Sequence, residues 1–298
     1  MKSIVVGADG PIGRALVQAL QHRDGFVYGT TRRPSNLSAN NLYLDLSDQH
    51  VADGPLPSVD IAFFCAAISS FSECRRDPTL AHRVNVDSPA ALARRLVTSG
   101  ARVVLLSTNA VFDGKMPIVP ASSRTCPVSV YGRVKAEAEA KFLTLGSAAA
   151  ILRLSKVLTP ELKLLIGWID ALSRGQQIVA FTDLRIAPVS LADAVTALLA
   201  IPDDPGGGIY QFSSTRDISY AEVARHLAHR IGVSSDHVME RRAVDAGIPV
   251  EEIRCFSSLD SSRLARIMRR AAPDPFAVLD AVYGPKIEAL VAKNRTMR

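Results

Sequence analysis

Long apolar runs, paired cysteines and a signal segment are all missing from this sequence of 298 residues. The longest uninterrupted apolar run, residues 61–68, is far shorter than the roughly 20 residues that span a bilayer. The first residues lead directly into a strand-like stretch, without the apolar region and small-residue cleavage site of a signal peptide. These absences predict a cytoplasmic protein with no membrane partner.

Cysteine and aromatic residues are scarce. The four cysteines form no CxxC pair and show no metal-ligand spacing, which argues against a disulfide framework and predicts reduced thiols and no metal site. Aromatic residues make up 6% of the chain and hydrophobic residues 48%. This balance suits a core of small aliphatic side chains, in which helices pack on a parallel sheet.

Negative charge is also in short supply, because the formal net charge is +6. Part of the excess lies in four arginines spaced along one expected helix: Arg263, Arg266, Arg269 and Arg270. No aromatic residues alternate with them, and no nucleic-acid-binding module is visible. We interpret the cluster first as a solvated face and second as a contact to an anionic cofactor or substrate. Nucleic acid is a distant third, so none is predicted as a partner.

Short apolar runs alternate with segments of helical periodicity, which is typical of a parallel sheet covered on both faces. Strands are expected at residues 3–6, 27–31, 42–44, 61–65, 102–107, 149–154 and 209–213, and helices at 12–22, 79–99 and 130–145. The fold class is therefore α/β, a doubly wound parallel sheet of the Rossmann type with a smaller C-terminal substrate lobe. Residues 1–153 are expected to bind the cofactor, with 183–199 returning to them, and residues 154–298 to form most of the lobe.

A GxxGxxG turn lies between the first strand and the first helix. It comprises Gly7, Gly10, Pro11, Ile12 and Gly13. Glycines allow the tight turn and let the backbone approach a pyrophosphate, while the helix N-terminus offers free N–H groups to phosphate charge. In this context the motif predicts a dinucleotide site.

The end of the second strand indicates which dinucleotide is bound. A site for NAD usually carries a carboxylate here for the ribose hydroxyls, whereas this strand ends in Thr31, Arg32 and Arg33, with no carboxylate in reach. Arginine can pair with a 2′-phosphate. The sequence predicts NADPH as the cofactor and leaves open which arginine binds the phosphate. The alternative is that both are ordinary loop charges.

Tyr131 and Lys135 are four residues apart and share one face of the expected helix. A free phenol has a pKa of about 10, and a neighbouring ammonium would lower it toward neutrality, where proton exchange with a carbonyl oxygen works best. Thr108, at the carboxyl end of the fifth strand, can donate a hydrogen bond to the same oxygen. Ser107 is less favoured by register for that role.

In order, the glycine turn, Cys65-Ala66-Ala67, Val84-Asn85, Ser107-Thr108 followed by Val-Phe-Asp-Gly, and the Tyr131/Lys135 pair resemble an extended short-chain dehydrogenase/reductase. Later stretches around residues 183–193, 208–213 and 258–264 are similar to the dTDP-4-dehydrorhamnose reductase (RmlD-like) sugar-nucleotide-binding family. The resemblance implies that Thr108, Tyr131 and Lys135 are catalytic, and that Lys135 also bonds the nicotinamide ribose. It further implies a cofactor site that includes, besides the glycine turn, Asp45 and Leu46 near the adenine, Ala66, Ala67 and Asn85. The remaining residues that we expect to bind the cofactor are Thr31, Arg32, Arg33 and Ser107.

The expected function is NADPH-dependent reduction of a keto group on a nucleotide-activated sugar, with Tyr131 as proton donor. A sugar-nucleotide epimerase or dehydratase on the same fold is the first alternative, although dehydratases carry an acid where this chain has Asn109. The second alternative is a non-catalytic dinucleotide-binding regulatory subunit. Lys156 and Trp168 either contact substrate or pack in the core or at the surface. A homodimer is the expected assembly if the chain is not monomeric, and the sequence leaves the oligomeric state open.

Overall fold

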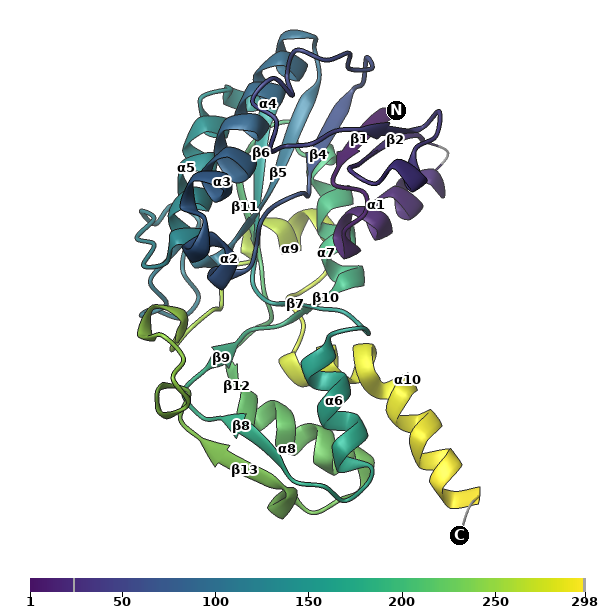
Figure 1. The fold of residues 1–298 in the computed structure, drawn as a ribbon, viewed down its shortest axis with the longest axis vertical. Helices are drawn as coiled ribbons and strands as arrows, with labels where there is room; N and C mark the ends of the chain where they lie inside the picture. Colours follow the sequence, from purple (N-terminus) through teal and green to yellow (C-terminus); the bar gives the residue numbers. More distant parts are fainter. Residues whose placement is uncertain (24, 297–298) are drawn as a thin grey trace.

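Seven parallel strands form the central sheet of the computed structural model, which describes residues 1–23 and 25–296 (Figure 1). Their order across the sheet is β11-β6-β5-β4-β1-β2-β3. The bounds are β1 Lys2–Val6, β2 Phe26–Thr31, β3 Asn41–Tyr43, β4 Ile61–Phe64, β5 Arg102–Thr108, β6 Ala149–Leu154 and β11 Gly208–Phe212. The direction of winding reverses between β1 and β4, so a crevice opens at their carboxyl ends. The predicted doubly wound α/β class is confirmed.

The inner strands are buried on both faces, which is why they could be read from the sequence. Every residue of β4 and β6 is at most 3% exposed. Such strands show as continuous apolar runs, and a parallel sheet needs helices on both sides to bury them. Each predicted strand of the sheet lies within one residue of its observed bounds.

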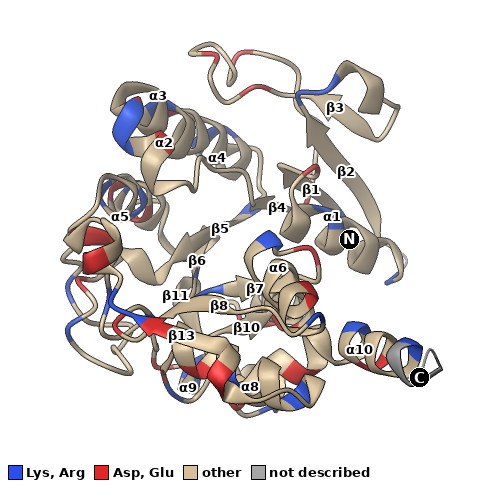
Figure 2. Ribbon diagram, turned by 60° about the horizontal axis from the view of Figure 1, so that its bottom comes forward, with Lys and Arg blue, Asp and Glu red and all other residues tan. Residues whose placement is uncertain are grey.

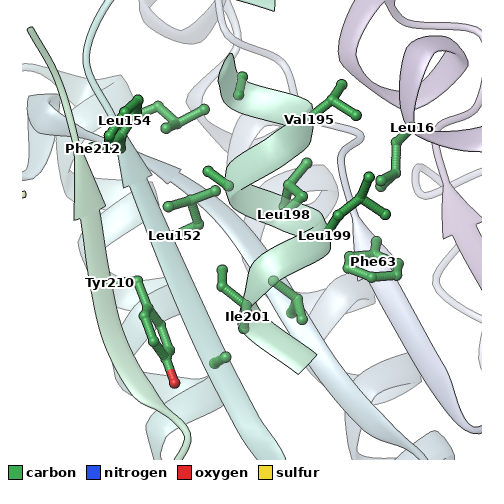
Figure 3. Packing of buried hydrophobic residues seen from close by; sticks show 14 of the residues in the cluster. Leu16, Phe63, Leu152, Leu154, Val195, Leu198, Leu199, Ile201, Tyr210 and Phe212 are labelled. Atoms are coloured by element: carbon green, nitrogen blue, oxygen red, sulfur yellow. The ribbon is translucent and has the colours of Figure 1, made fainter. Parts of the chain in front are cut away.

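Helices cover the two faces of the sheet. On one face α1 (Pro11–Gln21) packs beside α7 (Leu191–Ala200), and Figure 3 shows Val195 and Leu198 of α7 above Leu152 of β6. On the other face α4 (Ser88–Thr98) and α5 (Val130–Leu143) bury Leu92 and Phe142 against the strands.

The predicted helix at residues 79–99 is interrupted. It begins as α3 (Pro78–His82), where the Asp77 side chain accepts a hydrogen bond from the Leu80 N–H at 2.8 Å, as expected of a cap. It then widens into a π-helical turn, Arg83–Asp87, before continuing as α4. A short helix that the sequence does not predict, α2 (Phe71–Arg76), lies before α3. Helical periodicity alone cannot reveal the extra residue of a π turn.

The remaining chain forms a second part with its own core (Figure 1). Trp168, Leu227 and Tyr283 are buried there, so Trp168 is a core residue. Its elements are β7 Val157–Leu158, α6 Lys163–Leu172, β8 Ile178–Phe181, β9 Arg185–Ile186, β10 Val189–Ser190, β12 Ile218–Ser219, α8 Tyr220–Ile231, β13 Val238–Arg241 and α10 Pro275–Thr296. The chain returns to the first part through α7, β11 and α9 (Ser262–Met268). The first part therefore contains more of residues 154–298 than the sequence suggests.

One ion pair is buried in the first part. Arg153 of β6 and Glu139 of α5 are each 2% exposed, and the guanidinium lies 2.7 Å from the carboxylate. Glu139 also accepts a hydrogen bond from Ser107, and Arg153 donates to the side-chain oxygen of Gln211 on β11 at 3.1 Å. The pair therefore joins α5 to three neighbouring strands of the sheet.

Charges of both signs are spread over the outer helices (Figure 2). The arginines that the sequence assigns to a solvated face are partly engaged within the molecule. Arg263 lies 2.9 Å from Asp204 and 3.9 Å above the Tyr210 ring, and Arg270 lies 2.6 Å from Asp193. Their side chains are 36% and 54% exposed, so both lie at the surface and also have partners that are distant in sequence. Among residues 1–23 and 25–296, no helix combines the length and hydropathy of a membrane span.

Removing the buried carboxylate should destabilise the fold strongly. Glu139→Gln leaves the Arg153 cation without its counter-ion, and breaking a buried pair in this way costs about 3–5 kcal/mol. Urea unfolding should show this loss. The matched control is Glu137→Gln on the same helix, where the exposed pair with His82 should contribute less than about 1 kcal/mol. Equal stabilities of the two variants would contradict the role given to the buried pair.

Candidate functional site

A cavity of about 1130 Å³ opens at the carboxyl edge of the sheet and extends toward the second part. Its lining includes the glycine turn after β1, the ends of β2, β4 and β5, the start of α5 and segments around residues 184–186 and 248–257. All the site residues predicted from the sequence line it, except Asn85. The structure thus brings together residues from separate parts of the chain at the point where the sheet reverses direction.

The glycine turn leaves the start of α1 open. Gly7 has φ +92°, and a Cβ at Gly13 would come within 2.1 Å of the Gly7 carbonyl oxygen, so neither position accepts a side chain. No side chain caps the helix N-terminus at Gly10. Its first N–H groups are therefore available to an anion, as a dinucleotide pyrophosphate requires.

The end of β2 carries a carboxylate that the sequence does not predict. Asp9, from the glycine turn, accepts hydrogen bonds from the Thr31 hydroxyl at 2.5 Å and the Asn36 amide at 2.8 Å. Burial raises the pKa of Asp9, but these two bonds and the charge of Arg33 outweigh it and lower the pKa below its usual value. The expectation that no carboxylate is in reach is wrong, because the loop folds back over the strand.

Two arginines also lie at this edge of the cavity, Arg32 and Arg33. Arg32 lies 4.0 Å from Asp45, and its side chain is 70% exposed. Arg33 and Arg32 both line the cavity. Exposed guanidinium groups at this edge suit a phosphate, since the Asp9 carboxylate already accepts hydrogen bonds from Thr31 and Asn36.

Asn85 does not line the cavity but stabilises a loop that does. The side chain is 1% exposed, accepts from the Ile68 N–H at 2.9 Å and donates to the Ile68 carbonyl at 3.0 Å. It fixes the loop after β4, which carries Ala66 and Ala67 into the cavity. The resemblance places Asn85 in the cofactor lining, whereas the structure gives it this supporting place, since the π turn directs it toward the loop.

Thr108 and Tyr131 both line the cavity, and the Thr108 hydroxyl lies near enough to the phenol to lower the pKa of Tyr131. Ser129 caps α5 by accepting from the Gly132 N–H at 3.1 Å. A Cβ at Gly132 would lie 2.2 Å from the Ala110 carbonyl oxygen, so glycine lets the helix start press against the turn after β5. This close approach sets Tyr131 beside Thr108.

Burial raises the pKa of Tyr131 to about 12. The Thr108 hydroxyl and the charge of Arg254 oppose this effect, and the Cys74 thiol adds to it. The sequence predicts a lowering toward neutrality by Lys135, which is the opposite direction. In this structure the phenol keeps its proton at neutral pH.

The Lys135 ammonium explains the difference. It is 2% exposed and donates to the Leu106 carbonyl at 2.7 Å. Burial lowers the pKa of Lys135 to about 8, against the charges of Glu139 and Cys65, which raise it. The four-residue spacing does place Lys135 and Tyr131 on one helix face, but the ammonium is held by the strand backbone.

Ser107 belongs to the buried network rather than to the Thr108–Tyr131 pair, because its hydroxyl donates to Glu139. Some of the lining residues that the sequence does not predict come from the second part or from α2: Phe71, Leu184, Arg185, Ile186, Tyr220, Ile248, Glu252, Arg254 and Ser257. Lys156, one of the two open candidates, also lines the cavity. The sequence gives none of these residues except Lys156 a role in the site, so only the tertiary structure reveals that they line the cavity.

Comparison with known proteins shows which family the chain belongs to. A family model described as the RmlD substrate binding domain matches residues 1–273. The chain belongs to this family. It is therefore an RmlD-like member of the extended short-chain dehydrogenases/reductases, as the sequence motifs indicate.

Relatives of this RmlD-like chain carry different names. A dTDP-4-dehydrorhamnose reductase of Mycobacterium tuberculosis is 29% identical over 208 residues, covering 67% of this chain and 65% of that protein. The methionine adenosyltransferase 2 subunit beta of Xenopus laevis is 24% identical over 286 residues, covering 89% and 82%. Among solved structures, a dTDP-4-dehydrorhamnose reductase of Clostridium acetobutylicum has a TM-score of 0.79 at 20% identity, covering 95% of this chain and 99% of that one. At this identity the structural likeness shows the fold.

Lys135 of this RmlD-like protein should titrate far below an ordinary lysine. Nζ-detected NMR should report a pKa of about 8 in the protein without cofactor, because burial disfavours the ammonium. Lys135→Gln assigns the signal by its loss. The unfolded chain keeps this proton up to about pH 10.5, so the group makes the fold more stable as pH rises between about 8 and 10.5. An ordinary pKa near 10.4 would contradict the burial of the ammonium.

Proposed function

We propose that the protein is an NADPH-dependent reductase that acts on a keto group of a nucleotide-activated sugar. The observation that carries the proposal is that Thr108 and Tyr131 line one cavity together with a glycine turn that leaves a helix N-terminus open. Family membership supports it, as does the likeness to a Bacillus anthracis dTDP-4-dehydrorhamnose reductase structure in complex with NADP, with a TM-score of 0.78 at 19% identity.

The residues of the cavity fit the cofactor. The glycine turn and the open start of α1 would receive the pyrophosphate, Arg32 and Arg33 the 2′-phosphate, Asp45 and Leu46 the adenine, and Ala66 and Ala67 the chain between. Lys135 would bond the nicotinamide ribose. When bound, NADPH supplies a hydride to the carbonyl carbon of the substrate.

Tyr131 supplies the proton. With its pKa raised to about 12 by burial, the phenol is protonated at neutral pH and can donate to the carbonyl oxygen as the hydride arrives. Thr108, which lines the same cavity, orients the same oxygen. In this proposal the first part of the chain binds the cofactor, and the second part supplies Lys156, Arg185 and Arg254 to the substrate side of the cavity.

A second candidate function is that of a non-catalytic, dinucleotide-binding regulatory subunit. The long match to a protein named methionine adenosyltransferase 2 subunit beta favours it. So does the separation of the Lys135 ammonium, bonded to Leu106, from the phenol that it is expected to activate. A direct measurement of turnover separates the two candidates.

The first test concerns the proton donor. Tyr131→Phe keeps the ring and its edge-on contact with Phe71 but removes the hydroxyl. It should lower the single-turnover rate of NADPH oxidation with a 4-keto sugar nucleotide by about 10²–10⁴-fold and leave NADPH binding nearly unchanged. Tyr28→Phe, at a tyrosine of β2 outside the cavity lining, is the control and should change neither. Equal rates for the parent and Tyr131→Phe would refute the mechanism, and no turnover in either would favour the regulatory subunit.

The second test concerns the cofactor. NADPH should bind at least about tenfold more tightly than NADH, a difference of about 1.4 kcal/mol, because guanidinium groups pair with the 2′-phosphate. Fluorescence titration of a variant carrying Arg32→Ala and Arg33→Ala should lose most of that gap. Arg76→Ala, on α2 and outside the cavity lining, is the matched control. NADH binding as tight as that of NADPH to the parent would show that the Asp9 carboxylate dominates this edge.

A further inference from the structure

A single carboxylate connects both ends of the loop that carries Arg32 and Arg33 to the glycine turn. The loop runs from Thr31, the last residue of β2, to Asn36. Asp9, in the glycine turn, accepts a hydrogen bond from the Thr31 hydroxyl at 2.5 Å, and its other carboxylate oxygen accepts from the Asn36 amide at 2.8 Å. The two arginines therefore lie between two residues that are both held by Asp9.

The backbone of the loop is ordered around these two contacts. The Thr31 hydroxyl, which donates to Asp9, also accepts from the Arg33 N–H at 2.9 Å. The Asn36 N–H donates to the Arg33 carbonyl at 3.0 Å. Arg33 is therefore hydrogen-bonded through its N–H and its carbonyl to the two residues that Asp9 holds. The direction in which its side chain leaves the loop depends on the same carboxylate.

The guanidinium groups of the loop remain accessible to a ligand, because Arg32 and Arg33 are exposed and line the cavity. Burial raises the pKa of Asp9, but its two hydrogen bonds and the charges of Arg33 and Arg14 lower it below the usual value, so the carboxylate is an anion at neutral pH. Asp45 lies 4.0 Å from Arg32. Two carboxylates thus face three guanidinium groups, and a net positive charge remains here for a phosphate.

We propose that Asp9 is a positioning residue for cofactor selectivity, which holds Arg32 and Arg33 where they meet the 2′-phosphate of NADPH. It acts through the loop and not by contact with the ribose hydroxyls, which is the role of a carboxylate at the end of this strand in NAD sites. A loop that had to be ordered by the ligand would bind it more weakly. The proposal rests on the proposed function, since it concerns the same cofactor.

Two substitutions at Asp9 separate positioning from direct contact. Asp9→Ala removes both hydrogen bonds, so the loop loses its connection to the glycine turn. Asp9→Asn removes the charge but can keep both bonds, because its oxygen accepts from Thr31 and its amide donates to Asn36 once the Asn36 amide turns over. The turned amide still has the Ser35 hydroxyl beside it, which lies 3.3 Å from the present Asn36 oxygen. Positioning is therefore lost with alanine and kept with asparagine.

Fluorescence titration with NADPH and with NADH measures the selectivity as the ratio of two dissociation constants. Asp9→Ala should reduce the preference for NADPH by about 5–10-fold, through weaker NADPH binding alone, because only NADPH needs the arginines in place. Asp9→Asn should keep the preference of the parent. Rescue by the asparagine variant distinguishes the bonds of Asp9 from its charge.

Asn36 provides an independent test, because it is exposed and does not line the cavity. Asn36→Ala breaks one of the two bonds to Asp9 and should reduce the preference for NADPH by about 2–4-fold. In the Asp9→Ala protein the same change should have no further effect, since the bond is already gone. The matched control is Asn40→Ala, at another exposed asparagine outside the cavity lining, which should bind both cofactors as the parent does.

Several results would overturn the proposal. Equal losses of NADPH and NADH binding in Asp9→Ala would show general damage to the site. Stronger NADPH binding with weaker NADH binding in Asp9→Asn would show that the carboxylate contacts the ribose directly. Additive effects of Asp9→Ala and Asn36→Ala, or a parent without preference for NADPH, would also contradict it. Turnover plays no part in these outcomes, so a protein that binds as expected but oxidises no NADPH would refute only the reductase.

Discussion

The buried pair of Arg153 and Glu139 is the constraint on which the site depends. Two charges removed from water are tolerated only when they form an ion pair and their remaining hydrogen-bonding groups also have partners. Here Ser107 and Gln211 complete the set. Because one partner is on a central strand and the other on α5, the helix has a single favourable position on the sheet.

That position sets the chemistry. Tyr131, Lys135 and Glu139 follow one another at intervals of four residues along α5, so one face of the helix runs from the cavity into the core. Anchoring Glu139 in the core fixes the height and rotation at which Tyr131 meets Thr108. Gln211, a partner of Arg153, also donates to the Val119 carbonyl, and the neighbouring Ile118 N–H donates to Ser258. The network thus extends to the segment that carries Arg254.

Much of this could be predicted from the sequence, since strands buried on both faces and a glycine turn leave local patterns. The place of Thr108 and Tyr131 follows from the same topology. The partner of Lys135 does not, because spacing fixes a shared helix face but not which buried acceptor, here the Leu106 carbonyl, takes the ammonium. The sequence also could not predict that Asp9 lies at the end of β2 or that Arg254 lies beside Tyr131. Each is brought there by a loop that folds back over elements distant in sequence.

The regular spacing on α5 also bears on how this chain can change length over evolution. Inserting or deleting one residue between Tyr131 and Glu139 would rotate one end of the helix by about 100° relative to the other. Either the phenol would leave the cavity or the carboxylate would leave the core. Segments such as residues 242–249, which join short elements at the rim of the second part, carry no such phase relation. Variation in length among functional descendants should therefore accumulate at that rim, while α5 changes only by substitution.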